Sequence, residues 1–134
     1  MKAARPLTLV IIDDSAEVRE ALGEILDEES DLTLLDVASG VSEGIESVIR
    51  LQPDVVVLDV NMPDGGGLRA AREIAAALPE VRIIAFSAFD KMLIRKTMTA
   101  AGAEAYISKS ADISELLDAI RGNSGAGANA RSYL

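Results

Sequence analysis

The sequence contains no cysteine and no histidine among its 134 residues. Without cysteine the chain forms no disulfide, no thiolate metal site and no cysteine nucleophile, which suits a reducing compartment. Without histidine it lacks the commonest general base and cannot carry an internal phosphohistidine. Any chemistry must therefore come from carboxylates, hydroxyls, amines and backbone groups.

Clusters of positive charge and long apolar stretches are missing as well. The chain has 13 Lys and Arg against 22 Asp and Glu, a net charge of −9, so we expect no direct binding of nucleic acid. No stretch approaches membrane-spanning length. Lys2 and Arg5 precede an apolar run as in a secretory signal, but that run is short and ends in acids. We expect a soluble cytoplasmic protein.

Short apolar runs alternate with segments of helical periodicity. The length and the 49% apolar share fit one domain with one substantial core. Several runs are continuously apolar and β-branched, which is typical of strands covered on both faces. Strands are predicted at residues 7–12, 32–37, 55–58, 81–86 and 105–107, and helices at 18–26, 41–49, 68–78, 94–101 and 113–120.

The ends of several predicted helices carry recognisable signals. Pro79 ends the third helix, Gly102 closes the fourth, and Asp112 with Glu115 has the spacing of a capping box before the fifth. Five βα units predict an α/β protein with a doubly wound parallel sheet. The glycine run 65–67 predicts a mobile loop before the third helix. The last residues, 122–134, lose all periodicity and predict a flexible linker or tail.

Acidic side chains follow two of the predicted strands. Asp13 and Asp14 end the first strand, and Asp59 ends the third. The functional crevice of an open parallel sheet lies at the carboxyl ends of its strands, so these three carboxylates converge if the two strands are neighbours. Two unit charges about 4 Å apart repel by roughly 4 kcal/mol at an effective dielectric near 20. Mg²⁺, which prefers oxygen ligands, would resolve that conflict.

Each residue also has a simpler interpretation. Asp14 or Ser15 would serve as a helix cap, and Asp59 as a turn former. Ser87 and Lys109 follow the fourth and fifth runs; taken singly, they are a cap and a solvated lysine. Together, a hydroxyl and an ammonium group beside a metal ion suit the oxygens of a phosphoryl group. The whole set describes formation of an acyl phosphate on an aspartate.

In these positions the sequence resembles the receiver domain of bacterial two-component response regulators. The resemblance spans about residues 7–121 and rests on the DD pair at 13–14, the D-x-x-M-P stretch at 59–63, the SA pair at 87–88 and Lys109. It implies a flavodoxin-like (βα)5 fold with five parallel strands in the order 2-1-3-4-5, and a receiver domain at 1–121.

The resemblance also implies roles for individual residues. Asp59 would accept a phosphoryl group from a sensor histidine kinase or a phosphotransfer protein, and Lys109 would pair with that group. Asp13, Asp14, Asp59 and the backbone carbonyl of Asn61 would hold Mg²⁺, with Asp13 bound at closer range or through water. Such a domain is no enzyme in the ordinary sense, because it catalyses only its own phosphorylation and slow dephosphorylation.

Two further residues would report the phosphorylated state. Ser87 would swing toward the phosphoryl group, and Tyr106 would turn inward into the space that Ser87 leaves, changing the surface of the fourth helix, fifth strand and fifth helix. The simpler interpretation of Tyr106 is a half-buried aromatic on an edge strand. Asn61 and Phe89 match positions that tune attack of water on the aspartyl phosphate.

The sequence departs from the family pattern after Lys109, where Ser110 replaces the usual proline. A cis bond before a residue other than proline costs about 2.5–4 kcal/mol, so a trans peptide and a strained cis peptide both stay open. Two other functions stay open too. One is a pseudo-receiver, a binding scaffold that works without phosphate. The other is an aspartyl phosphohydrolase, which the position of Asn61 disfavours because such enzymes have a general acid there.

The sequence indicates partners other than the kinase only in general terms. A fused or separate effector domain is open, and so is a homodimer that depends on phosphorylation. In such a dimer a basic strip would meet acids of a second copy, although surface charges are usually only solvated. The strip is Lys91, Arg95 and Lys96, and the acids are Asp112, Glu115 and Asp118.

Overall fold

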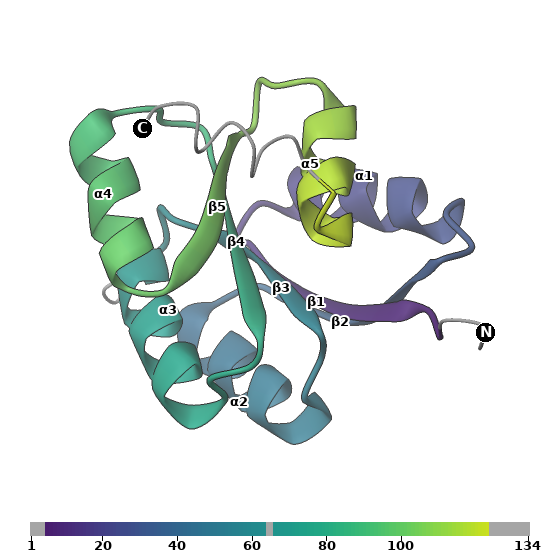
Figure 1. Ribbon diagram of the computed structural model, residues 1–134, viewed down its shortest axis with the longest axis horizontal. Coiled ribbons are helices and arrows are strands. Elements are labelled where there is room, and N and C mark those ends of the chain that lie inside the picture. The colour runs from purple at the N-terminus through teal and green to yellow at the C-terminus, as the bar shows by residue number, and fades with distance from the viewer. Residues whose placement is uncertain (1–4, 64–65, 124–134) are drawn as a thin grey trace.

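The computed structural model describes residues 5–63 and 66–123, and over these residues five strands alternate with five helices (Figure 1). The strands are β1 (Leu7–Ile12), β2 (Leu32–Ala38), β3 (Val55–Asp59), β4 (Arg82–Ser87) and β5 (Ala103–Ser108). The helices are α1 (Ala16–Asp27), α2 (Val41–Leu51), α3 (Gly66–Ala77), α4 (Met92–Ala100) and α5 (Ile113–Arg121).

The strands form one parallel sheet in the order β2-β1-β3-β4-β5. Helices α1 and α5 cover one face, and α2, α3 and α4 cover the other (Figure 1). The predicted fold class and strand order are therefore confirmed. The first and third strands are neighbours, with Ile12 opposite Leu58, so the carboxyl ends of β1 and β3 lie together.

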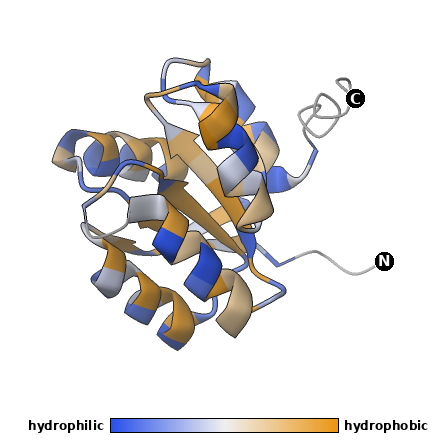
Figure 2. Ribbon diagram, turned by 90° about the vertical axis from the view of Figure 1, so that its left-hand side faces the viewer, coloured by the Kyte–Doolittle hydropathy of each residue, from blue (hydrophilic) through white to orange (hydrophobic). Residues whose placement is uncertain are grey.

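The core has two halves, one on each face of the sheet. Along β1, Leu9 and Ile11 point to the α1 and α5 side, whereas Val10 and Ile12 point to the α2 and α3 side. Figure 2 shows the apolar strands at the centre of the domain and, around them, helices in which hydrophilic and hydrophobic segments alternate. Continuous apolar strands are what such a covered sheet requires, because both faces of the central strands lose contact with water. The edge strand β2 differs, since Leu35 and Val37 on its outer face are exposed.

Every predicted element is present, and its ends differ from the prediction by no more than about two residues, as is usual for helix and strand boundaries. Strand β5 extends to Ser108 because it pairs there with Ser87 of β4. Asp112 caps α5 by accepting a hydrogen bond from the Ser114 N–H at 3.0 Å. No helix in the described ranges combines the length and apolar character needed to span a bilayer.

The glycine run needs a correction. Gly66 and Gly67 do not belong to a mobile loop; they are buried and begin α3. Tight packing against the end of β3 explains this, because a Cβ at Gly67 would lie 2.6 Å from the backbone oxygen of Asp59. Gly65 and most of the predicted tail, 124–134, lie outside the described residues.

Candidate functional site

Three carboxylates gather at the carboxyl end of the sheet. Asp13 and Asp14 follow β1, Asp59 ends β3, and one oxygen from each lies within 4.8 Å of the others. We call these three residues the acid pocket. Asp13 and Asp59 are buried, at 1% and 4% exposure, whereas Asp14 is exposed. The convergence that the sequence predicted is thus observed, and solvent reaches the pocket on the side of Asp14.

Asp13 is held by hydrogen bonds on several sides. Its N–H donates to the carbonyl of Ala38 at 3.0 Å, and its Oδ1 accepts from the N–H of Ser15 at 2.9 Å. The Arg19 guanidinium donates to its backbone carbonyl at 2.9 Å. Ser15 in turn caps α1 by accepting from the Val18 N–H at 3.2 Å. The helix cap and the acidic pair therefore coexist in one turn, so the simpler interpretation of Ser15 is also correct.

Lys109 reaches into the acid pocket from the loop after β5. Its Nζ lies 2.9 Å from Asp13 Oδ2 and 3.4 Å from Asp59 Oδ1. Burial acts to lower the pKa of Lys109, but hydrogen bonds and charge interactions with Asp13 and Asp59 outweigh it and the pKa is raised. Lys109 therefore stays charged. One ammonium group still leaves the three carboxylates undercompensated.

Asp59 carries the clearest sign of that imbalance. Burial, followed by the charge of Asp13, raises the pKa of Asp59 to about 6, although the Asn61 N–H and Lys109 act in the opposite direction. The Asn61 N–H donates to Asp59 Oδ1 at 3.2 Å. A carboxylate in this state gains more from an added cation than an ordinary surface acid does.

The loop that carries Lys109 has well-defined geometry. The Lys109–Ser110 peptide is trans, as are all peptide bonds in the described part of the chain. The Lys109 N–H donates to the carbonyl of Ser87 at 2.7 Å, and the Ser110 N–H donates to Ser108 Oγ at 3.1 Å. Of the two possibilities that the sequence left open, the structure has the unstrained one, and serine in place of proline still directs Lys109 to the acids.

Ser87 and Tyr106 both bind the segment between β4 and α4. The buried hydroxyl of Ser87 accepts from the Phe89 N–H at 3.0 Å. The hydroxyl of Tyr106 donates to the Phe89 carbonyl at 2.6 Å, and the Tyr106 side chain is only 8% exposed. Tyr106 is thus buried rather than half-buried, and one peptide segment connects it to Ser87. The Phe89 side chain is 46% exposed.

Sequence reasoning missed the contacts of two arginines. Arg19 supports Asp13, and no local pattern marks it. Arg95, expected in a basic strip, binds Asp90 at 2.6 Å and lies 4.9 Å from the centre of the Tyr106 ring. An acidic residue five positions before a helical arginine is too common to predict the contact with Asp90.

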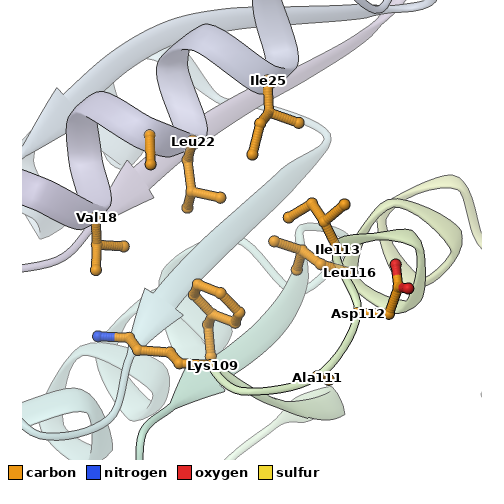
Figure 3. Close-up of a pocket in the computed structure, with 10 residues that line it drawn as sticks. Val18, Leu22, Ile25, Lys109, Ala111, Asp112, Ile113 and Leu116 are labelled. Atoms are coloured by element: carbon orange, nitrogen blue, oxygen red, sulfur yellow. The ribbon is translucent and has the colours of Figure 1, made fainter.

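An apolar groove of about 250 Å³ lies between α1 and α5 (Figure 3). Its walls are mainly Val18, Leu22 and Ile25 on α1 and Ile113 and Leu116 at α5, and the stem of Lys109 lines one end. The groove therefore adjoins the acid pocket, but it brings no further titratable group into contact with the three carboxylates.

The comparison with protein families agrees with this geometry. The model of the response regulator receiver domain matches residues 9–121. The chain belongs to this family. Receiver domains are signalling modules rather than ordinary enzymes, and this receiver has the flavodoxin-like CheY fold.

Curated relatives and solved structures support the assignment. The receiver is 32% identical to the transcriptional regulatory protein YxjL of Bacillus subtilis and 30% identical to the response regulator UvrY of Escherichia coli, each over 115 residues. These alignments cover 86% of this chain but 53% of each relative, so the chain spans about half the length of the curated relatives it matches.

Two solved structures illustrate the likeness in fold. The response regulator domain of Thermotoga maritima CheB has a TM-score of 0.81 at 29% identity, with 89% of this chain and 96% of that chain covered. A chain of the CheX–CheY–BeF3–Mg²⁺ complex from Borrelia burgdorferi has a TM-score of 0.82 at 26% identity, with 88% and 89% covered.

Proposed function

We propose that this receiver is a phosphoacceptor: Asp59 takes a phosphoryl group from a sensor histidine kinase or a phosphotransfer protein, with Mg²⁺ in the acid pocket. The observation that carries the proposal is the buried Asp59 between two other carboxylates, with the Lys109 ammonium 3.4 Å away. In a scaffold without such chemistry this arrangement would only cost stability, because charges of one sign are held together away from water.

The donors of the acid pocket fit Mg²⁺. All are hard oxygen atoms, and Asp14 leaves one side open to the waters that Mg²⁺ usually keeps. Asp14, Asp59 and the backbone carbonyl of Asn61 would hold the ion. Both oxygens of Asp13 already accept hydrogen bonds, from the Ser15 N–H and from Lys109, so Asp13 would contribute through a remaining lone pair or a bridging water. When bound, Mg²⁺ supplies positive charge to the phosphoryl oxygens.

The residues of the chain account for the transfer itself. A bond forms between one Asp59 carboxylate oxygen and phosphorus while the bond from phosphorus to the donor's leaving group breaks. Lys109 neutralises charge on the transferred group, and the Ser87 hydroxyl hydrogen-bonds one of its oxygens. Burial of Asp59, at 4% exposure, limits attack of water on the product.

The signal would leave the site through the segment that Ser87 and Tyr106 share. Phe89 binds Ser87 through its N–H and Tyr106 through its carbonyl, so a movement of Ser87 toward the phosphoryl group disturbs both contacts. Phosphorylation then shifts an existing equilibrium of Tyr106 and of the surface formed by α4, β5 and α5. That surface would bind an effector domain, fused or separate, or a second copy of the receiver.

Labelling with acetyl phosphate tests the proposal. In the presence of Mg²⁺, intact-mass spectrometry should show one phosphoryl adduct on the wild-type protein and none on Asp59→Asn. Asp54→Asn is the matched control, because it alters an aspartate just before the same strand and should be labelled like the wild type.

Other outcomes of this experiment identify the alternatives. A folded wild type that binds Mg²⁺ but gains no adduct would indicate a phosphate-independent binding scaffold. Turnover of acetyl phosphate without accumulation would indicate a phosphohydrolase. Size-exclusion chromatography with and without beryllofluoride, which mimics the phosphoryl group, would show whether the activated form dimerises.

A further inference from the structure

The first turn of α3 lies directly against the backbone of the phosphoacceptor. An ideal Cβ at Gly67 would lie 2.6 Å from the backbone oxygen of Asp59 and 2.6 Å from the Cα of Val60. The N–H of Gly67 donates to the Val60 carbonyl at 2.9 Å. Because the nearest atoms belong to the backbone, no rotation of a neighbouring side chain would make room for a methyl group.

Gly66 adds a second restriction of the same kind. It has a φ of +61°, and a Cβ there would lie 2.9 Å from the Val60 carbonyl oxygen. Its N–H donates to the carbonyl of Pro63 at 3.1 Å. Two successive positions therefore lack a Cβ where α3 meets the chain that leaves β3. These glycines matter because they let α3 approach the Asp59–Val60 backbone closely, not because they are flexible.

The packing indicates which side of this contact would yield to a side chain. On α3, Ala70, Ala71 and Ile74 are fully buried, so the helix cannot retreat without opening the core. On the other side, the ladder between β1 and β3 ends at Leu58, and the ladder between β3 and β4 ends at Asp59. The chain from Val60 onward is therefore the softer partner. Its displacement would move the Asn61 carbonyl and, through the hydrogen bond from the Asn61 N–H, the Asp59 carboxylate.

We propose that Gly67, assisted by Gly66, is a positioning residue for the acid pocket. By allowing α3 to rest on the Asp59–Val60 backbone, it fixes the Asp59 carboxylate relative to Asp13 and Asp14. It acts through the backbone and touches neither metal nor phosphoryl group. The inference rests on the proposed function for its consequence in Mg²⁺ binding, but the positional effect itself is measurable in the metal-free protein.

The test compares Gly67→Ala with two glycine variants away from the pocket. Gly102→Ala strains a φ of +119° and places a Cβ 3.0 Å from the Ala75 side chain, whereas Gly23→Ala meets nothing within 4 Å. Gly67→Ala should weaken Mg²⁺ binding on the order of tenfold, as loss of support around a metal ligand does. The two controls should stay within about twofold of the wild type, because distant sites act independently.

Amide NMR spectra of the metal-free protein give a second readout. In Gly67→Ala the shifts should change most at Asp59, Val60 and Asn61, and little at Ala71 and Ile74 in the body of α3. If Gly67→Ala does not fold, Gly66→Asn carries the test, because asparagine tolerates positive φ and meets only the Val60 oxygen. Its effects should have the same direction and a smaller size.

The outcomes separate this inference from the proposed function. Mg²⁺ affinity of Gly67→Ala within about twofold of the wild type, with shift changes confined to α3, would overturn the positioning role. A wild type that binds no Mg²⁺ would instead overturn the metal site. In that case the shifts of Asp59 and Asn61 would still decide whether Gly67 positions them.

Discussion

Two aspartates at opposite ends of β3 have opposite surroundings. Asp54, just before the strand, accepts two hydrogen bonds from the Arg5 guanidinium at 2.8 Å each and one from the Thr8 N–H at 2.8 Å. Hydrogen bonding to Arg5 lowers the pKa of Asp54 to about 2. Asp59, at the far end, is buried beside Asp13, and its pKa is raised to about 6.

The difference separates an aspartate that holds the fold from one whose surroundings suit the proposed phosphoacceptor. At the amino end of the sheet the charge of Asp54 is fully matched, and its hydrogen bonds tie β1 to the start of β3. At the carboxyl end, the three carboxylates carry more negative charge than Lys109 neutralises. The stability of the rest of the domain offsets the unfavourable free energy of this arrangement. Uncompensated charge where two neighbouring strands end is therefore a better indicator of function than a matched ion pair.

The largest expected effect is stabilisation by Mg²⁺ at the Asp59 end. At a hundredfold excess over its dissociation constant, one bound ion adds about 2.7 kcal/mol to the free energy of unfolding. Differential scanning calorimetry should show a raised melting temperature for the wild type and for Asp54→Asn. The increase should shrink strongly in Asp59→Asn; an equal increase in that variant would place the ion elsewhere.

Neutralising the two aspartates in the absence of Mg²⁺ should change stability in opposite directions. Asp54→Asn weakens hydrogen bonds to a charged group and should lower the free energy of unfolding by about 1–3 kcal/mol. Asp59→Asn removes repulsion from Asp13 and should raise the free energy of unfolding, with a melting temperature higher by a few degrees. Urea titrations and thermal scans of both variants beside the wild type measure these quantities, and a loss of stability in both variants would contradict the contrast.

The pH dependence should distinguish Asp54 further. Its pKa falls from 3.8 to about 2 on folding, so its charged form stabilises the folded state above about pH 4. That contribution is lost as the pH falls from about 4 to about 2. The stability difference between wild type and Asp54→Asn in urea titrations should therefore be constant near neutral pH and shrink over this interval. A difference that persists at pH 2 would mean that charge is not its cause.

The smallest expected effect concerns the hydrogen-bonded hydroxyl of Tyr106 at the carboxyl end of the sheet. Tyr106→Phe removes the hydrogen bond to the Phe89 carbonyl and should cost about 0.5–1.5 kcal/mol. Chemical denaturation measures the loss, and amide shifts at Phe89 and Asp90 locate it. If neither the stability nor the amide shifts change, the Tyr106 hydroxyl does not hold this segment. Unmatched polar groups at the carboxyl end of the sheet would then extend beyond the acid pocket.

Much of the fold was predictable because the central strands are apolar on both faces. Each residue of β3 from Val55 to Asp59 is buried, and such a run has few stable environments other than a covered parallel sheet. The acid pair and Asp59 were predictable for the same reason, since each directly follows such a run. Arg19 was not, because its partner is a backbone carbonyl that no sequence pattern marks. Gly67 was misread because a glycine gives the same signal for mobility and for close packing.

The sequence by itself determined the order of the elements, the family, and the kinds of groups that end each strand, because periodicity and strand-end chemistry are local properties of a chain. Only the tertiary structure decided that Lys109 lies closer to Asp13 than to Asp59, that Tyr106 is buried against the Phe89 carbonyl, and that α3 leaves no room for a side chain at Gly67. These features depend on how closely separate elements approach one another, and packing rather than local preference fixes that approach.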